Sequence, residues 1–355
     1  MKFKKTAIIL SILSVMFSFF SLSGIAEQKN KKKEKEEKIY IPNEVKSLIE
    51  EGLAARQSHL DIPFEIVRFL YLPAQQNVHA VFMLKIKNAD LDFKPLIPNA
   101  IEEKTKNEKS AELQKNKESQ LESSQPIQAD FKFFAQIYEK KEGKVGTVVR
   151  ESYAPASFRE ESSSFKPEEE NIYSIGMPFP PGDYLLALAI TSPDLSKIGL
   201  QYFEFSLPDS LSFQDKLGMT PVFFIESLKQ HEQPEILTQV HKNSFVFSTL
   251  EIFPKMQNIF SPGEPLDIFY YIYGCKPDPE TNQYNIEIQY QVKKGEESIV
   301  KFKEKSFSFP LISHPLPVLK SDNQPPEPSL YVLEISINDK ISGHSFTENI
   351  EFEIR

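Results

Sequence analysis

A run of alternating side chains over residues 182–191 constrains the fold of this chain more than any other feature. After a turn that contains Pro and Gly, every second residue from Tyr184 to Ile190 is large and apolar. A period of two places these side chains on one face of a β-strand. The chain turns at 192–194 and returns through a second such run at 202–207. The stretch therefore predicts an antiparallel hairpin with a buried face.

The same pattern occurs a second time near the C-terminus. Apolar side chains alternate over 331–337, a polar turn occupies 338–340, and a further alternating run covers 350–354. Two copies of one hairpin indicate two β modules. Elsewhere the sequence contains short strand-like runs separated by turns of Pro, Gly, Asn and Asp, which is typical of a sandwich or a barrel. The strand–helix–strand alternation of a parallel α/β sheet is absent from the sequence.

These patterns predict a mainly β fold made of two tandem antiparallel β-sandwich domains. The first domain covers 60–208 and the second covers 241–355, with a connector at 209–240. Interleaved Glu and Lys residues with few apolar ones predict a long charged loop, 99–127, inserted in the first domain. The chain has 355 residues, which is enough for this organisation.

The segment 27–59 precedes the first domain and combines a charged tether with a short helix. Its part up to residue 38 mixes Lys and Glu and lacks the apolar surface needed to fold. Apolar residues at helical spacing in 45–53 predict a short helix, with Asn43 as its N-cap. We expect this helix to pack on the first domain, and a helix that binds a partner is the alternative.

Residues 1–26 have the features of a secretory signal peptide. Lysines near the start precede an apolar core at 7–20, and the small residues at 24 and 26 suit a signal peptidase. The core is shorter than a membrane span of about 20 residues, so cleavage is expected rather than retention as an anchor. We therefore predict a protein exported to the periplasm, the cell envelope or the outside of the cell, with no membrane span after cleavage.

Charge and cysteine content narrow the classes of partner. The formal charge is −9, and the loss of three lysines and no acid with residues 1–26 gives the mature chain −12. Such an acidic chain is a poor partner for nucleic acid. Because Cys275 is the single cysteine, the chain has no internal disulfide and each domain depends on its own apolar core. We expect Cys275 to be buried, and a free thiol is the alternative.

One tetrapeptide resembles a feature of a known family of β-sandwich domains. Pro181-Gly182-Asp183-Tyr184 stands ahead of a long strand, as in the approach to the penultimate strand of immunoglobulin-like and fibronectin-III-like domains. Residues 328–331 resemble it less closely, and the turn at 260–264 resembles the opening of such domains in exported bacterial proteins. The resemblance implies that Tyr184 hydrogen-bonds back to the backbone as a tyrosine corner. The Cys–Trp–Cys core of antibody domains is missing, because the chain has one Cys and no Trp.

The sequence contains no motif for catalysis, cofactor binding or metal binding. The six histidines lack the spacing of helical zinc sites, and the nucleophile elbow, the phosphate loop and the dinucleotide loop are absent. We therefore predict no catalytic, cofactor-binding or metal-binding residues and no enzyme activity. One alternative is a hydrolase whose site combines His241, His314 and nearby carboxylates. Another is a passive structural spacer that uses the tether.

Aromatic side chains on the predicted strand at 266–273 are the candidate binding residues. Phe269, Tyr271 and Tyr273 share one face of this strand, and Tyr270 lies on the other. One face must point into the core, and the other is either covered or exposed as a flat platform for sugar or peptide. The predicted function is that of an exported binding or accessory protein whose partner is another envelope protein.

Overall fold

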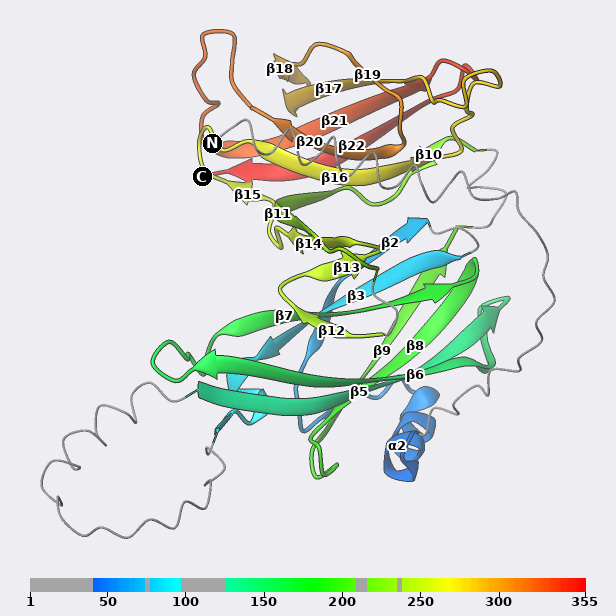
Figure 1. The fold of residues 1–355 in the computed structure, drawn as a ribbon, viewed down its shortest axis with the longest axis vertical. Coiled ribbons are helices and arrows are strands. Elements are labelled where there is room, and N and C mark those ends of the chain that lie inside the picture. The colour runs from blue at the N-terminus through cyan, green and yellow to red at the C-terminus, as the bar shows by residue number, and fades with distance from the viewer. Residues whose placement is uncertain (1–40, 74–76, 97–125, 209–215, 235–237) are drawn as a thin grey trace, which may run out of the picture. The chain divides into compact units, whose positions relative to one another are not determined.

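The computed structural model describes five stretches of the chain and is mainly β (Figure 1). They are residues 41–73, 77–96, 126–208, 216–234 and 238–355. The predicted signal peptide, the tether and most of the charged insertion therefore lie outside the described residues. One α-helix, α2 (Asn43–Leu53), occurs in these stretches, and none of their helices is long and apolar enough to cross a membrane.

The chain divides into two compact units. The N-terminal unit comprises Ile39–Pro208 and Glu235–Phe245, and the C-terminal unit includes Asp209–Pro234 and Val246–Arg355. Each unit is built from sheets whose strands are almost all antiparallel, which confirms the predicted mainly β class. The segment predicted as a connector, 209–240, contributes strands to both units.

The first sheet of the N-terminal unit contains the predicted hairpin. Its strands, in spatial order, are β1 (His59–Leu60), β9 (Ile198–Leu207), β8 (Gly182–Thr191), β5 (Pro126–Lys141) and β4 (Lys94–Pro95), and β6 (Lys144–Glu161) also pairs with β5. β8 and β9 pair in one continuous register from Gly182 opposite Leu207 to Thr191 opposite Ile198. The last two residues of the predicted insertion, Pro126 and Ile127, belong to β5 and pair with β6.

The second sheet of this unit packs its aromatic residues against the first. Its order is β12 (Val240–Lys242), β7 (Glu170–Phe179), β3 (Val78–Lys87) and β2 (Glu65–Pro73). Phe82 on β3 meets Phe205 on β9 with ring centroids 5.0 Å apart, and Tyr173 on β7 meets Phe131 on β5 at 5.5 Å. Because all four rings are buried, these contacts form much of the core between the two sheets.

Helix α2 covers the other face of the first sheet. Its buried residues Val45 and Ile49 pack with apolar side chains of β5, β8 and β9. Tyr202 on β9 donates a hydrogen bond to the Ile49 carbonyl at 2.6 Å, which fixes the helix on the sheet. The predicted helix is confirmed, but its predicted cap is wrong. Pro42 takes the N-cap position and Asn43 is the first helical residue, with no side-chain capping bond.

The C-terminal unit also contains two sheets. One has the order β10 (Gly218–Met219), β16 (Leu266–Tyr273), β11 (Phe223–Gln230), β14 (Leu250–Pro254) and β13 (Phe245–Phe247), with β20 (Leu311–Leu316) also paired to β16. The other has the order β15 (Ile259–Phe260), β22 (Ser345–Ile354), β21 (Ser329–Asp339), β17 (Ile286–Lys294) and β18 (Glu297–Lys301), with β19 (Lys305–Phe307) paired to β17. Between them, the hydroxyls of Tyr270 and Tyr290 lie 2.9 Å apart in the core.

Both units contain a tyrosine whose hydroxyl bonds back to the backbone ahead of its strand. The Tyr184 hydroxyl donates to the Pro180 carbonyl at 2.9 Å, and the Tyr331 hydroxyl donates to the Glu327 carbonyl at 2.7 Å. Each bond reaches back four residues to the segment that leads into the strand. The bond implied by the sequence resemblance is therefore present at the stronger match and also at the weaker one.

Candidate functional site

The aromatic residues named as candidates for a binding platform are mostly covered. Tyr270 points into the core of the C-terminal unit, so the face that carries Phe269, Tyr271 and Tyr273 is the opposite one. Phe269 is nevertheless fully buried, and its ring lies 5.2 Å from that of Phe223 on the neighbouring strand. Tyr271 and Tyr273 are half-buried, and burial raises the pKa of Tyr271. The strand therefore does not present three exposed rings.

The two histidines of the hydrolase alternative lie in different units. His241 lies on β12, opposite Ser174 of β7, and His314 lies on β20. The Lys305 ammonium donates to His314 Nε2 at 2.6 Å. Burial, followed by the charge of Lys305, lowers the pKa of His314 to about 4. His314 is therefore neutral near pH 7, and no carboxylate contacts it within the described residues.

No metal site emerges, and the single thiol is not activated. In the stretches that the structure describes, no group of three or more His, Cys, Asp or Glu side chains could hold a metal ion. Cys275 is half-buried beside the core of the C-terminal unit. Burial, with a smaller effect of Asp339, raises the pKa of Cys275 to about 12. The group is thus a thiol rather than a nucleophilic thiolate near neutral pH.

Strand β6 forms an open edge of the N-terminal unit. It pairs with β5 along its whole length, from Glu161 opposite Pro126 to Lys144 opposite Lys141, and with no other strand among the described residues. Residues 146–149 are all exposed. An edge of this kind presents backbone N–H and C=O groups that can pair with another strand.

The exposed part of this edge is apolar. Val148 is 39% exposed, Val149 is 49% exposed and Tyr153 is 38% exposed. A β-bulge accounts for two consecutive exposed valines, because Arg150 lies opposite Ile137 while Val148 lies opposite Tyr138. We call Lys144–Tyr153 the β6 edge.

Arg150 gives the β6 edge an uncompensated positive charge. Its guanidinium donates to the carbonyl of Pro178 and lies 5.6 Å from the ring centroid of Phe179. Burial lowers the pKa of Arg150, and no carboxylate contacts it in the described part of the chain. The neighbouring acid is engaged, since Glu151 pairs with Lys46 at 3.2 Å and accepts from Gln136 at 2.9 Å. The guanidinium thus has a carbonyl and a ring as neighbours but no carboxylate, and a carboxylate from a partner could use its remaining N–H groups.

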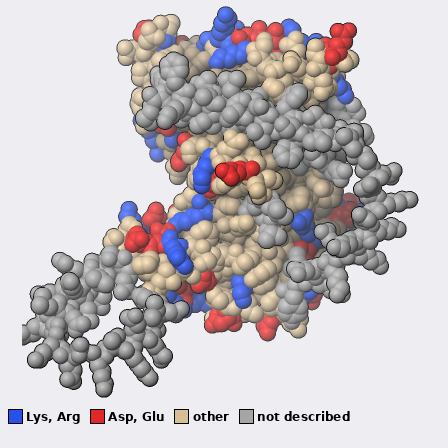
Figure 2. Space-filling view, viewed as in Figure 1, with Lys and Arg blue, Asp and Glu red and all other residues tan. Residues whose placement is uncertain are grey.

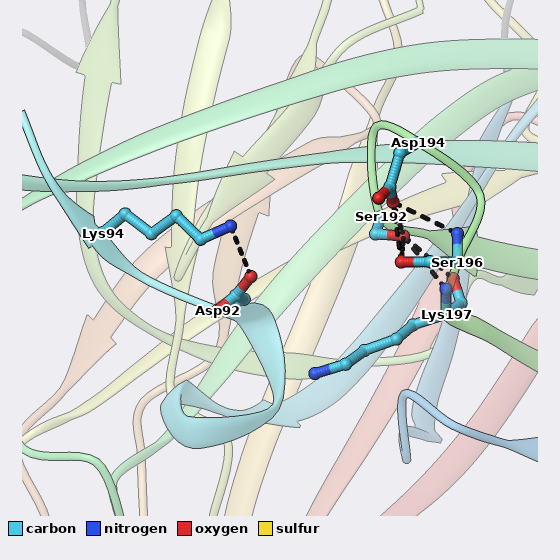
Figure 3. A network of polar contacts seen from close by, with 6 residues as sticks. All are labelled: Asp92, Lys94, Ser192, Asp194, Ser196 and Lys197. Atoms are coloured by element: carbon cyan, nitrogen blue, oxygen red, sulfur yellow. Dashed lines mark hydrogen bonds and ion pairs between the residues drawn. The ribbon is translucent and has the colours of Figure 1, made fainter.

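A small cavity lies at the opposite end of β5 from the exposed part of this edge. Its volume is about 170 Å³, and four segments of the N-terminal unit line it. They are the segment at Ile62, the segment 90–96 that includes the end of the 3₁₀ helix η1 (Asn88–Leu91), the start of β5 and the β8–β9 turn. Figure 3 shows the Asp92–Lys94 pair on one side of this region and the turn with Ser192 and Lys197 on the other.

The β8–β9 turn beside the cavity is held by its own polar groups. Asp194 accepts from the hydroxyl of Ser192 at 2.7 Å and from the hydroxyl of Ser196 at 2.8 Å, and it also accepts from the Ser196 backbone N–H (Figure 3). These bonds hold the pKa of Asp194 well below its usual range. The Lys197 backbone N–H donates to the Ser192 hydroxyl at 3.0 Å. The polar groups of the turn therefore bond mainly to one another. The turn places the Lys197 side chain in the lining of the cavity.

Neither the β6 edge nor the cavity was among the predicted sites. Alternation along 146–150 predicts a strand but does not say that the strand lies at a sheet edge. The cavity combines residues that are separated by more than a hundred positions, such as Ile62 and Lys197. The adjacent valines at 148 and 149 do not reveal it either, because adjacent apolar residues such as Phe133 and Phe134 are buried elsewhere in the chain.

Comparisons with known proteins do not place the chain in a family. No family model matches it, and no curated protein matches it. Among solved structures it is similar, over 83% of its length, to dimeric latent PorU from Porphyromonas gingivalis, with 8% sequence identity and a TM-score of 0.29. The match spans 20% of that protein's chain. A TM-score this low does not establish a common fold.

Proposed function

We propose that this chain is an exported, non-enzymatic accessory protein of the cell envelope that binds another protein through the β6 edge. The observation that carries the proposal is the open, apolar stretch of a strand that, within the described part of the chain, pairs on one side only. The partner would contribute an extended segment that adds to the sheet as a further strand. Main-chain hydrogen bonds then provide affinity, and alternate side chains provide specificity.

The side chains of the β6 edge define the chemistry of this partner segment. Val148, Val149 and Tyr153 retain between 38% and 49% exposure, so a partner would bury apolar surface on all three. Completing their burial is worth on the order of 1 kcal/mol each. Arg150 favours a carboxylate on the partner, because a guanidinium binds a carboxylate with two parallel hydrogen bonds. We therefore expect an extended segment with apolar residues and an Asp or Glu.

Self-pairing of the β6 edge is unfavourable in two of its registers. Antiparallel self-pairing centred on Arg150 or on Glu151 places that side chain opposite its own copy, and like charges directly opposite each other are unfavourable. Where Figure 2 shows described residues, basic and acidic side chains are interspersed rather than gathered in a patch of one sign. A different protein with an acidic strand is the better partner.

Two further parts of the proposal concern the fold family and the export of the chain. The hydrogen bonds of Tyr184 and Tyr331 support immunoglobulin-like sandwiches in both units. Residues 1–26 support export, and the expected mature protein begins at Glu27. Mass spectrometry of the protein from an envelope fraction tests the second point. An intact N-terminus on protein from the cytoplasm would contradict it.

Site-specific crosslinking in the producing cells tests binding at the β6 edge. A photoreactive residue replaces Val149, and the control places it at Leu330, an equally apolar residue that is 58% exposed in the other unit. We expect one discrete crosslinked protein from position 149 and none from position 330. Val148→Lys in the same chain should abolish that crosslink. Equal products from both positions, or a crosslink that Val148→Lys does not weaken, would refute the proposal.

A further inference from the structure

The cavity of the N-terminal unit holds two opposite charges that make no hydrogen bond or close ion pair among the described residues. Of its charged side chains, Asp92 pairs with Lys94 at 2.8 Å, and Asp130 accepts from the Gln128 amide at 2.8 and 3.0 Å. The two that remain are Asp90 and Lys197, which line the cavity without a hydrogen bond or close ion pair. Their neighbouring opposite charges, Lys87 and Asp61, act on them only at longer range. In Figure 3 the Lys197 side chain extends toward the segment that carries Asp92, and no contact is drawn to its ammonium group.

Apolar side chains form the floor between these charges. Ile62, Leu91 and Phe131 line the cavity and are each at most 3% exposed. Leu96 and Pro193 extend this surface toward the rim. A ligand held by the two charges would therefore place an apolar group against a preformed apolar wall, which is the usual composition of a small-molecule site.

The size of the cavity limits the ligand. Its volume of about 170 Å³ is well below the roughly 300–1,000 Å³ of sites for drug-sized molecules. A nucleotide or an oligosaccharide would not fit within this volume. The cavity can hold a molecule with one ammonium group, one carboxylate and a short aliphatic side chain.

We propose that this cavity binds a small apolar zwitterion, namely an aliphatic α-amino acid. Asp90 receives the ammonium group of the ligand, Lys197 receives its carboxylate, and its side chain contacts Ile62, Leu91 and Phe131. Both charges are at the rim and accessible to solvent, so each contributes modestly. The expected dissociation constant for L-leucine is on the order of 1 mM. This site is independent of the β6 edge.

Calorimetry or ligand-observed NMR with the full mature chain tests the site through analogues. L-leucine should bind, whereas N-acetyl-leucine lacks the ammonium and leucinamide lacks the carboxylate, so each should bind about tenfold more weakly for the loss of one charged contact. Isovalerate, which is apolar and only anionic, should also bind weakly. Absence of leucine binding up to about 10 mM, or equal binding of leucinamide or isovalerate, overturns the proposal.

Variants assign each charge to its half of the ligand. Lys197→Gln should weaken leucine about tenfold and leave leucinamide unchanged, and Asp90→Asn should weaken both but leave N-acetyl-leucine unchanged. Lys141→Gln is the matched control, because Lys141 lies at the far end of β5 with a side chain that is 77% exposed. Circular dichroism confirms that each variant is folded. If both cavity variants bind leucine as the control does, the assignment is wrong.

Discussion

Removal of either hydroxyl from the buried tyrosine pair should destabilise the C-terminal unit more than removal of both. Tyr270 and Tyr290 come from the two sheets of that unit, and each is fully buried. Their hydroxyl oxygens are 2.9 Å apart, and each hydroxyl has no other hydrogen-bond partner among the described residues. Burial raises the pKa of both groups, so both hydroxyls are protonated throughout the neutral range.

The magnitude follows from what each substitution leaves behind. Tyr270→Phe or Tyr290→Phe leaves the other hydroxyl without a partner in an apolar core, which lowers the free energy of unfolding by about 1–3 kcal/mol. The double Phe variant removes both polar groups and keeps the shape of the rings, so its stability should lie within about 1 kcal/mol of the wild type. A double-mutant cycle should therefore give a coupling free energy of at least about 1 kcal/mol.

The single cysteine provides a probe for this unit alone. Cys275 packs beside its core with a pKa raised to about 12, so its thiol reacts slowly while the unit is folded. The rate of modification at increasing urea concentration reports opening of the unit, and its denaturant slope separates global from local opening. Tyr153→Phe, at an exposed ring in the other unit, is the control and should leave the rate unchanged. Additive effects of the two core substitutions would refute the reasoning.

Three further predictions concern single groups. The pKa of His314 is lowered to about 4 in the folded protein, so the unfolded chain binds a proton at this residue first as the pH falls below about 6.5. The free energy of unfolding should therefore decline between about pH 6.5 and 4. Urea midpoints of His314→Gln should show less of this decline. Tyr331→Phe leaves the Glu327 carbonyl without its donor and should lower the free energy of unfolding by about 1 kcal/mol in the same assay. Asp339→Asn should lower the free energy of unfolding by about 2–3 kcal/mol, because this fully buried carboxylate accepts from two backbone N–H groups and the hydroxyl of Ser342. A thermal midpoint equal to that of the wild type would contradict the assigned bonds.

Features set by local sequence were predictable. The hairpin at 182–207 follows from a period of two, because burial of one face requires it. The bond from the Tyr184 hydroxyl back to the backbone follows from the local sequence before the strand, because its donor and acceptor are four residues apart. Helix α2 follows from apolar spacing, although Asn43 as a cap does not. A cap depends on the local backbone conformation, and Pro42 already supplies the extended geometry that precedes the helix.

Features set by strand neighbours were not predictable. Alternation says which face of a strand is apolar but does not say which strand lies beside it. Phe269 and Tyr270 are both fully buried, so both faces of β16 are covered at this point. The sequence alone does not say whether the face with Phe269 is covered or exposed. Likewise, β12 pairs with β7 of the N-terminal unit, although it lies at the predicted start of the second domain. Three residues are too short a run to reveal a partner that is more than sixty positions away.

The two proposed sites are separable because they use opposite ends of one strand. The cavity involves β5 at Gln128, whereas the exposed valine at 148 lies opposite Tyr138 of the same strand. Ten residues of extended chain place these points about 30 Å apart. At that distance, rim charges on the cavity are screened from Arg150 by more than two Debye lengths of about 8 Å. A substitution in the cavity therefore acts on the β6 edge only if it changes the packing of β5 itself. Lys197 and Asp90 lie outside that strand, so their variants should disturb one site and leave the other intact.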